Sequence, residues 1–417
     1  MKIFRTFFFL VIIFSCSDRE PLNPLDPKNQ ITQGKPTGLR AETNRDTIHL
    51  FWDYPDINDL SGFHIYLGRD ESELKVFDST SSTIATYMKT GLMYDKPYQF
   101  ALKIKTKFGE SALSDPLSVV LGPVNIWIAD IQSSMIWHLS YDGAHVLKQH
   151  MIFNPTAIIY EQESQVLWMA NYYEKNIIAM DRELIQKDEI ILSGRPVDMA
   201  FDKIEKTIFV LQSDSLIKGY TTSGIEKYRI NLDEKMSLYS RLAYDAKTKS
   251  LWTTNYLQNS MIRVEMSQDS IRIVPFSDFN RPFSIEADPI EGGVWVSTNN
   301  GLLRIKKDNT ITQFKAGMYI SDISINPNNG DCYYTANSLD KNTWETGYLS
   351  YSQPENSKQI LGNEYRYLYN IKVVPGSGSP GFFIQQHSSG KLLRFDVKGE
   401  LIGEMKYFDR FLDFALD

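Results

Sequence analysis

The chain has 417 residues, of which 23 % are charged, and a formal net charge of −7 at pH 7. A mildly acidic chain of this composition lacks the basic footprint that nucleic-acid binding requires, so no nucleic-acid partner is expected. Only two cysteines are present, Cys16 and Cys332, which excludes a disulfide framework and leaves the hydrophobic core to stabilise the fold.

The first sixteen residues have the organisation of an export signal. Basic Lys2 and Arg5 precede an apolar run over residues 7–14 that is too short to span a membrane as a mature helix. The end of this run, IFSC at residues 13–16, resembles a bacterial lipobox. The resemblance implies a lipoprotein signal peptide over residues 1–16, lipidation of Cys16 and anchoring in the bacterial cell envelope, at the outer membrane or cell surface. Ordinary signal cleavage, with Cys16 incidental, is the alternative.

Residues 17–34 follow the signal, and their composition predicts an extended tether. Pro21, Pro24 and Pro27 fall within this segment, and few large apolar residues accompany them. Prolines at this density favour a semi-rigid spacer. The stretch resembles the Asn-Pro-Leu-Asp-Pro segment found behind the lipidated cysteine of many bacterial surface lipoproteins. The resemblance implies that it holds the folded domains away from the membrane.

Residues 35–122 carry the signs of a small β-domain. The segment PTGLRAETNRDTIHLFWDYP alternates apolar and polar residues, and further strands follow as far as Leu121. Short strands repeated in this way predict a β-sandwich. The segment resembles a fibronectin type III domain, whose pattern is matched by Pro36, Leu39, Ala41, Trp52, Leu92, Tyr98 and residues 109–111. The resemblance implies a spacer or adhesion module without chemistry of its own.

Residues 123–417 repeat one pattern seven times. An apolar strand carries a large aromatic anchor, a second strand follows after a polar loop, and a third kind of strand precedes the anchor. The anchors are Trp127, Trp168, Phe209, Trp252, Trp295, Tyr333 and Phe382. Self-similarity at a period of roughly 40 residues predicts an all-β fold, a seven-bladed β-propeller whose units stack around an axis. A long β-sandwich, or two unrelated β-domains, is the alternative.

The first repeat lacks a strand before its anchor. The chain ends instead with RFLDFALD, which has the form of the missing strand. We therefore expect the C-terminal strand to be the innermost strand of the blade that begins near Asn125. Such pairing would close the ring and leave few exposed edges.

The repeats also share a cue within their strands, namely an apolar strand that ends in Asp or Asn, a polar loop and a strand of the form Ile-x-Arg/Met-x-Asp. By this cue the propeller resembles the broad class that contains NHL, YVTN-type and virginiamycin-lyase-like propellers. NHL rings usually have six blades, so seven repeats favour the YVTN-type and lyase-like forms. The class contains both enzymes and pure binders, so the resemblance does not select a function.

One face of a propeller collects the loops that lead into the innermost strands, and the aligned repeats place polar residues there. Four would ring the mouth of the channel: Asn154, Arg195, Arg281 and Arg410. Five more would face one another across the channel: Asp198, Arg241, Asp322, Asn370 and Asp413. The set predicts a pocket for an anionic or hydroxyl-rich ligand, with arginine supplying bidentate donors. A solvated channel in which Arg and Asp side chains pair with one another is the alternative.

Aromatic residues make up 13 % of the chain, and five tyrosines fall in predicted loops: Tyr172, Tyr173, Tyr256, Tyr319 and Tyr367. Exposed aromatic side chains on one face suit the binding of a sugar or a peptide. Packing between blades and at their rims is the alternative.

Signals for catalysis and cofactors are weak, and no catalytic residue is assigned. Only His387 of the six histidines is predicted in a loop on this face, whereas a virginiamycin-type lyase would need a histidine and a glutamate close together there. Asp198, Asp322, Asn370 and Asp413 could supply oxygen ligands to Ca²⁺, and no other cofactor is expected.

Together these patterns predict a monomeric, lipid-anchored binding protein of the cell envelope. The lipid would hold the protein on the membrane, and the propeller face would bind a protein, a glycan or a small molecule. A propeller enzyme, a lyase or lactonase acting on an exported small molecule, is the alternative.

Overall fold

The computed structural model describes residues 25–29, 32–53, 57, 59–69, 73–267, 270–338, 340–375, 381–405 and 411–416. The predicted signal peptide with Cys16, much of the predicted tether, and Arg410 lie outside these residues. Within the described part of the chain, no helix is long and apolar enough to cross a membrane.

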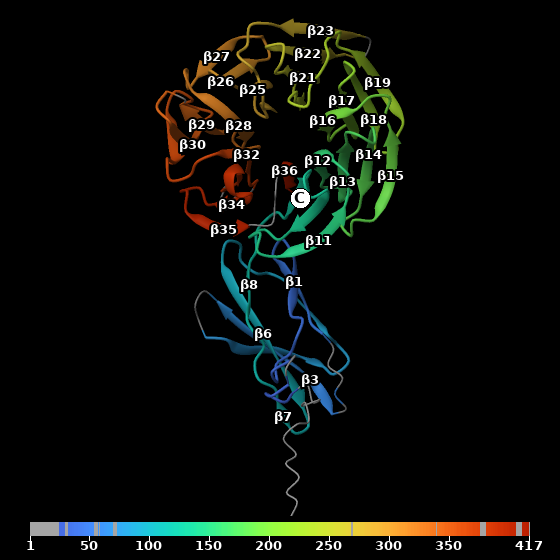
Figure 1. Cartoon of the computed structure of the whole chain (residues 1–417), viewed down its shortest axis with the longest axis vertical. Helices are drawn as coiled ribbons and strands as arrows, with labels where there is room; N and C mark the ends of the chain where they lie inside the picture. The colour runs from blue at the N-terminus through green and yellow to red at the C-terminus, as the bar shows by residue number, and fades with distance from the viewer. Residues whose placement is uncertain are drawn as a thin grey trace, which may run out of the picture. The chain divides into compact units, whose positions relative to one another are not determined.

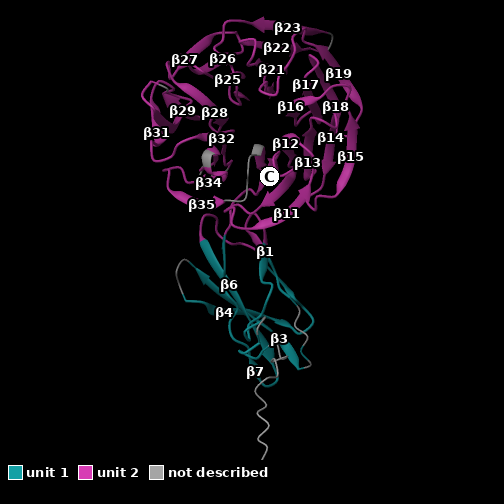
Figure 2. Cartoon of the chain, in the orientation of Figure 1, with its two compact units in different colours: residues 1–41, 49–89, 97–119 teal, residues 42–48, 90–96, 120–417 magenta. Residues whose placement is uncertain are grey.

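The chain divides into two compact units (Figure 2). Unit 1 comprises residues 1–41, 49–89 and 97–119, and unit 2 comprises residues 42–48, 90–96 and 120–417. Both are built from β-strands, and the one helix in the described ranges is a 3-10 turn, η1 (His387–Ser389).

The first eight strands form two sheets. One has the order β1 (Arg40–Asn44), β2 (Thr47–Phe51), β5 (Thr86–Lys89). The other has the order β4 (Lys75–Ser81), β3 (Leu60–Arg69), β6 (Pro97–Thr106), β7 (Gly109–Glu110), with β8 (Leu117–Val120) also paired to β6. Buried aromatic side chains build the core here, and Trp52 packs edge-on against Phe63 with ring centroids 5.1 Å apart.

The remaining strands form seven four-stranded antiparallel sheets, as far as the structure describes the chain, and these surround a central opening (Figure 1). The first sheet contains, from the inside outward, β36 (Phe411–Leu416), β9 (Ile126–Asp130), β10 (Met135–Leu139) and β11 (Val146–Met151). The next three are β12 (Pro155–Glu161), β13 (Val166–Asn171), β14 (Asn176–Met180), β15 (Gln186–Ile191); β16 (Pro196–Asp202), β17 (Thr207–Gln212), β18 (Leu216–Thr221), β19 (Glu226–Asn231); and β20 (Leu242–Asp245), β21 (Ser250–Asn255), β22 (Ser260–Met266), β23 (Ile271–Phe276). The last three are β24 (Ile285–Ala287), β25 (Gly293–Thr298), β26 (Gly301–Lys306), β27 (Ile311–Phe314); β28 (Tyr319–Ile325), β29 (Cys332–Ser338), β30 (Thr343–Leu349), β31 (Ser357–Leu361); and β32 (Leu368–Val373), β33 (Phe382–Gln386), β34 (Lys391–Phe395), β35 (Leu401–Met405). This is the arrangement of a β-propeller, with the sheets as its blades.

A repeated turn joins the first two strands of several blades and explains a recurrent aspartate. Asp202, Asp245 and Asp288 stand where the innermost strand ends, and each Oδ1 accepts the backbone N–H groups two and three residues later. Side-chain oxygens of Asp satisfy turn N–H groups in this way, so the residue marks the reversal of the chain.

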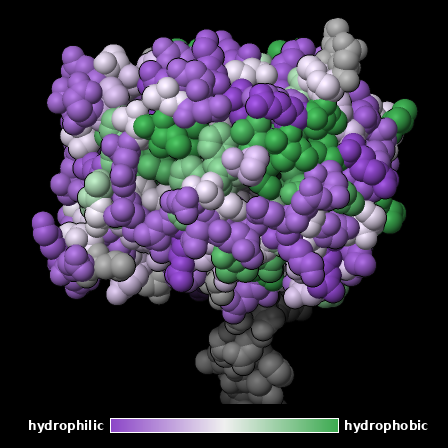
Figure 3. Space-filling model, turned by 90° about the horizontal axis from the view of Figure 1, so that it is seen from above, coloured by the Kyte–Doolittle hydropathy of each residue, from purple (hydrophilic) through white to green (hydrophobic). Residues whose placement is uncertain are grey.

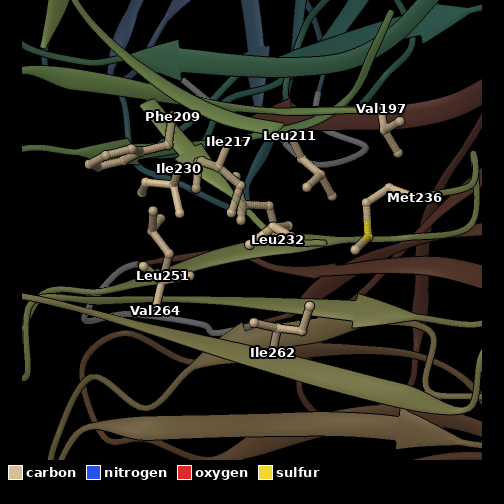
Figure 4. Packing of buried hydrophobic residues seen from close by; sticks show 12 residues of the cluster. Val197, Phe209, Leu211, Ile217, Ile230, Leu232, Met236, Leu251, Ile262 and Val264 are labelled. Atoms are coloured by element: carbon tan, nitrogen blue, oxygen red, sulfur yellow. The ribbon is translucent and has the colours of Figure 1, made fainter. Parts of the chain in front are cut away.

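Neighbouring blades cover one another's faces. Strands β17, β21 and β25 are therefore buried along their whole length rather than alternately. Figure 4 shows one of these layers, in which side chains of two successive blades interdigitate: Phe209, Leu211 and Ile217 on one side, and Leu251, Ile262 and Val264 on the other. Because each sheet needs its neighbours to remove its apolar faces from water, stability belongs to the stack and not to a single blade.

The aromatic anchors occupy equivalent places in the blades, with one correction. Trp295 is paired across strands with Arg304, whose guanidinium carbon lies 5.4 Å from the indole centroid. In the last blade Arg394 is paired with Phe383 and lies 5.1 Å from its ring, so Phe383, and not the predicted Phe382, is the equivalent residue. The connection between β32 and β33 is longer than the corresponding connections in the other blades. The repeat spacing therefore placed the predicted anchor one residue too early.

The outermost strands leave apolar side chains exposed on the rim. Figure 3 views the molecule from above, relative to Figure 1, and shows apolar side chains gathered in a band on that side. Exposed isoleucines of outer strands include Ile191, Ile271, Ile273 and Ile311. In β23, Arg272 alternates with isoleucines and Pro275 has no N–H to offer, which makes this edge a poor template for a further strand.

Replacing Arg304 with methionine should lower the free energy of unfolding by about 3–5 kcal/mol, because the Asp288 carboxylate would stay buried without its charged partner. Arg304 Nη2 lies 2.7 Å from Asp288 Oδ2, and the two side chains are 8 % and 1 % exposed. Denaturant titration measures the change. Arg272→Met is the matched control, since that side chain is 75 % exposed, and it should shift stability by about 0.5 kcal/mol or less. Equal losses in the two variants would contradict the prediction.

Candidate functional site

The inner strands share a bulge near their first residues. In β16 the pairing with β17 skips one residue between Pro196 and Asp198, and β12, β28 and β36 have a skip at the corresponding place. In β32 the skip falls one residue later, at Asn370. A bulge leaves one residue out of the ladder and changes where its neighbours point. Asp198, Asp322 and Asp413 each follow a skipped residue directly.

A cavity of about 480 Å³ lies on the axis of unit 2, and all seven inner strands or the residues beside them contribute to its wall. The inner strands β12, β16, β28, β32 and β36 face the centre in Figure 1. Five of the nine predicted binding residues line this cavity: Asp198, Arg241, Asp322, Asn370 and Asp413. The structure thus brings together the residues that were predicted to face one another across the channel.

The three aspartates of the wall also join neighbouring blades. Each carboxylate accepts a hydrogen bond from a backbone N–H on the inner strand of the next blade. The three bonds are Asp198 Oδ2 with Leu242 N at 2.7 Å, Asp322 Oδ2 with Ile371 N at 2.7 Å, and Asp413 Oδ2 with Ile158 N at 3.1 Å. Inner strands of different sheets do not pair with each other, so these side chains satisfy backbone groups that would otherwise face the cavity.

Burial changes the titration of these carboxyl groups. It raises the pKa of Asp198 and of Asp322 to about 6, and it raises the pKa of Asp413 as well. Nearby cations oppose the effect of burial, with Arg241 acting on Asp198 and Lys372 acting on Asp322 and Asp413. The wall is therefore charged at neutral pH and accepts protons in mildly acidic solution.

Lys372 and Glu286 form a charged pair in the same wall, and sequence reasoning missed both. Lys372 Nζ lies 3.4 Å from Glu286 Oε1. Burial alone would lower the pKa of Lys372, but the surrounding carboxylates, Glu286 first, hold it above its usual value. The signal was available, because Lys372 lies two residues after Asn370 and side chains two apart on a strand share a face.

Four of the five other side chains at the level of this pair are small, and the fifth is Ile159. Ala200, Ala243, Ser324 and Ala415 line the cavity there. Small side chains leave the space open, and the charged and hydroxyl groups around it can both donate and accept hydrogen bonds.

Arg241 is held in place by the protein itself. Its Nη1 donates to the carbonyl oxygens of Leu238 and Ser240, at 2.9 and 3.0 Å, and its guanidinium carbon lies 5.1 Å from the Phe283 ring centroid. The guanidinium therefore supplies positive charge beside the aspartates without pairing directly with them.

The predicted mouth residues Asn154, Arg195 and Arg281 do not line the cavity, and Arg410 lies outside the described residues. Asn154 and Arg281 have φ angles of 49° and 50°, so the chain turns in the left-handed region before the inner strand begins. The Arg195 guanidinium carbon lies 5.3 Å from the Tyr172 ring centroid, and that of Arg281 lies 5.5 Å from the Tyr256 centroid. Stacking on these loop tyrosines directs the two arginines to the preceding blade.

The described residues contain no group of three or more His, Cys, Asp or Glu side chains that could hold a metal ion. The three aspartates of the wall direct oxygens to backbone N–H groups on three different blades, which does not fit a Ca²⁺ site.

The described wall of the cavity does not pair a histidine with a glutamate. No histidine lines it, and His387 packs edge-on against Tyr369, with ring centroids 5.6 Å apart. The wall offers Glu286 and aspartates as bases, but each already has a partner within the protein.

No family model matches the chain, and no curated protein matches its sequence. Solved structures do resemble it. A streptogramin B lyase structure is 16 % identical, covers 62 % of this chain and 86 % of its own, and has a TM-score of 0.50. The β-propeller domain of Cps50 (Swd1) from Myceliophteria thermophila is 8 % identical, with 60 % and 85 % covered and a TM-score of 0.49. At 16 % identity, the likeness to the streptogramin B lyase structure shows the β-propeller fold alone.

Asp198→Asn should weaken the pH dependence of stability between about pH 4 and 6. Because the pKa of Asp198 is raised on folding, the folded protein binds more protons than the unfolded chain in this window, so the free energy of unfolding falls as pH rises through it. The variant keeps an oxygen that can accept from Leu242 N–H but has no proton to lose. Urea titrations at pH 4, 5 and 6.5 measure the free energy of unfolding. From pH 4 to 6.5 it should fall less in the variant than in wild type, by on the order of 1 kcal/mol.

The matched control is Asp188→Asn on the exposed face of β15. It should leave the slope of stability against pH unchanged. Parallel slopes for wild type and Asp198→Asn would contradict the prediction.

Proposed function

We propose that this protein is a lipid-anchored binding protein of the bacterial cell envelope, whose propeller holds a small hydroxyl-rich ligand in its axial cavity. The observation that carries the proposal is the cavity of about 480 Å³, whose wall combines several small side chains with charged groups of both signs. Charged and hydroxyl groups that donate and accept around one space match the many hydroxyls of a mono- or disaccharide.

Charge balance supports a neutral polar ligand over a strongly charged one. The wall contains four carboxylate residues, Asp198, Glu286, Asp322 and Asp413, and three basic residues, Lys203, Arg241 and Lys372. Because both signs of charge are distributed around the cavity, no part of its wall strongly favours a ligand of one charge sign. A sugar can hydrogen-bond to both kinds of group without bringing a buried charge that has no partner.

The N-terminal part of the proposal is a fibronectin type III module that carries the propeller. Two sheets of three strands and of five strands, with Trp52, Leu92 and Tyr98 buried, support it. We also propose that the C-terminal strand closes the ring, and the antiparallel pairing of β36 with β9 supports this. The anchor rests on the lipobox-like sequence that ends at Cys16.

Ala243→Leu should abolish ligand binding, because the added carbons would fill space at the level of Lys372 and Glu286. The measurement is isothermal titration calorimetry of the full-length protein with a panel of neutral mono- and disaccharides at millimolar concentration. Ala144→Leu is the matched control, since it makes the same change at an exposed turn and should bind as wild type does. Thermal melting checks that both variants fold.

Two results would count against the cavity as the site. One is a wild-type protein that binds no sugar of the panel. The other is an Ala243→Leu variant that binds with unchanged affinity.

Cys16→Ala should release the protein from the membrane fraction, because several acyl chains give stable anchoring and the variant can carry none on this residue. Intact-mass measurement of the membrane-purified wild type should show a lipid increment on Cys16. Cys332→Ala is the control, because that cysteine is buried in β29 and should not affect partitioning into detergent. An unmodified Cys16 in membrane-bound protein would refute the anchor.

A further inference from the structure

The ends of the blades that carry the loops into the inner strands form one face of the ring, here called the mouth face. Antiparallel pairing fixes its membership, because the first residue of an inner strand lies opposite the last residue of the second strand, as Pro155 does to Asn171 and Pro196 to Gln212. The segments before inner strands and the turns after second strands therefore lie together on this face.

Aromatic and arginine side chains follow one another across four successive blades of the mouth face. Near β16, the guanidinium carbon of Arg195 lies 5.3 Å from the Tyr172 ring centroid and 5.7 Å from that of Tyr173. The two tyrosine rings contact each other edge-on, with centroids 5.3 Å apart. Tyr172 packs against the apolar cluster that contains Met236 and Leu242, so this group borders the segment that leads into β20.

The next part of the same run is continuous. Tyr239 and Tyr256 have ring centroids 5.5 Å apart, and Tyr256 and Phe283 have theirs 6.2 Å apart. Arg281 lies over Tyr256 and repeats the arrangement of Arg195 on the tyrosines of the preceding blade. We call this surface the Arg–Tyr strip, and it consists of Tyr172, Tyr173, Arg195, Leu238, Tyr239, Tyr256, Leu257 and Arg281.

Several members of the strip are open to solvent although they are large and apolar or aromatic. Tyr173, Leu238, Tyr239 and Leu257 are 59, 44, 53 and 62 % exposed. Tyrosine and arginine clustered with exposed aliphatic side chains are the composition of protein-binding hot spots.

The charge of the strip selects the partner. Arg195 and Arg281 form no ion pair with any carboxylate in the described part of the chain. Asp214 lies against the Gly194 backbone and Asp278 bonds to Ser277, and neither forms a salt bridge with these arginines. The guanidinium groups retain donors for carboxylates that come from outside the molecule.

The geometry points to a docking surface for an acidic polypeptide segment of another protein, and not for a sugar. The guanidinium groups already cover a face of Tyr172, Tyr173 and Tyr256, which removes ring faces on which a pyranose would stack. What the strip presents outward is guanidinium donors, phenol edges and leucine side chains. An acidic segment with interspersed apolar residues complements all three.

The strip and the axial cavity are separate sites. Neither arginine of the strip lines the cavity, and the cavity wall lies on inner strands, whereas the strip lies on loops. Failure of sugar binding in the cavity would therefore leave this proposal intact, and failure of peptide binding would leave the cavity proposal intact.

Surface plasmon resonance of the full-length protein in detergent tests the strip, with an immobilised glutamate–tyrosine copolymer as the acidic probe. Wild type should bind it, and Arg195→Ala/Arg281→Ala should bind at least 10-fold more weakly. The matched control is Arg229→Ala/Arg272→Ala, which removes the same charge from side chains that are 62 and 75 % exposed on outer strands, and it should bind within 2-fold of wild type. Tyr173→Ala, at a side chain 59 % exposed, is a second variant should the double variant melt early.

Three results would overturn the proposal. The copolymer could fail to bind wild type, or the control could lose as much affinity as the double variant, which would mean non-specific attraction. Binding of alginate or polygalacturonate with the same dependence on Arg195 and Arg281 would assign the strip to an acidic glycan instead.

Discussion

The fold depends on how seven sheets are joined where they meet at the axis. Inner strands of adjacent blades belong to different sheets, so no ladder of backbone hydrogen bonds connects them. Side chains replace the ladder, as when Asp198 accepts from Leu242 N–H and Asp322 accepts from Ile371 N–H. The same positions set the polarity of the cavity wall, so the chemistry of the candidate site follows partly from the requirement to hold the ring together.

This double role explains which parts of the structure could be predicted from the sequence. The strand–turn–strand repeat was readable because buried strands, aspartate-capped turns and aromatic anchors recur with a nearly constant period. The anchor Phe383 was missed by one residue because a longer connection breaks the period in that blade. Asp198, Asp322 and Asp413 could be placed on the wall from the same alignment.

Other features depend on contacts that a single sequence does not reveal. The direction of Arg195 and Arg281 is decided by tyrosines on the turn of the preceding blade and, for Arg281, by a left-handed φ angle. The spacing of the repeats reveals neither the tyrosine contacts nor the φ angle. The hydrogen bonds between the wall aspartates and the next blade were likewise invisible, because their backbone partners can be any residue type.

The two proposed sites differ in the rigidity of what carries them. The cavity wall lies on strands that are fixed by pairing and by buried packing, which suits a small ligand that needs groups at set distances. The Arg–Tyr strip lies on turns, whose conformations can adjust to a larger partner. A propeller can therefore discriminate finely on its axis and accommodate variation on its mouth face.

The pairing of β36 with β9 has a consequence for biosynthesis. The bond between Asp413 and Ile158 joins residues 255 positions apart, and the sheet that contains β9 has no inner strand until residues 411–416 have been made. Closing so long a loop carries a large entropic cost, and contacts of this span form late. During synthesis at roughly 5–20 residues per second, β9 would wait many seconds with one edge unpaired. Until residues 411–416 have been made, β9 therefore offers a free strand edge with which another strand could pair.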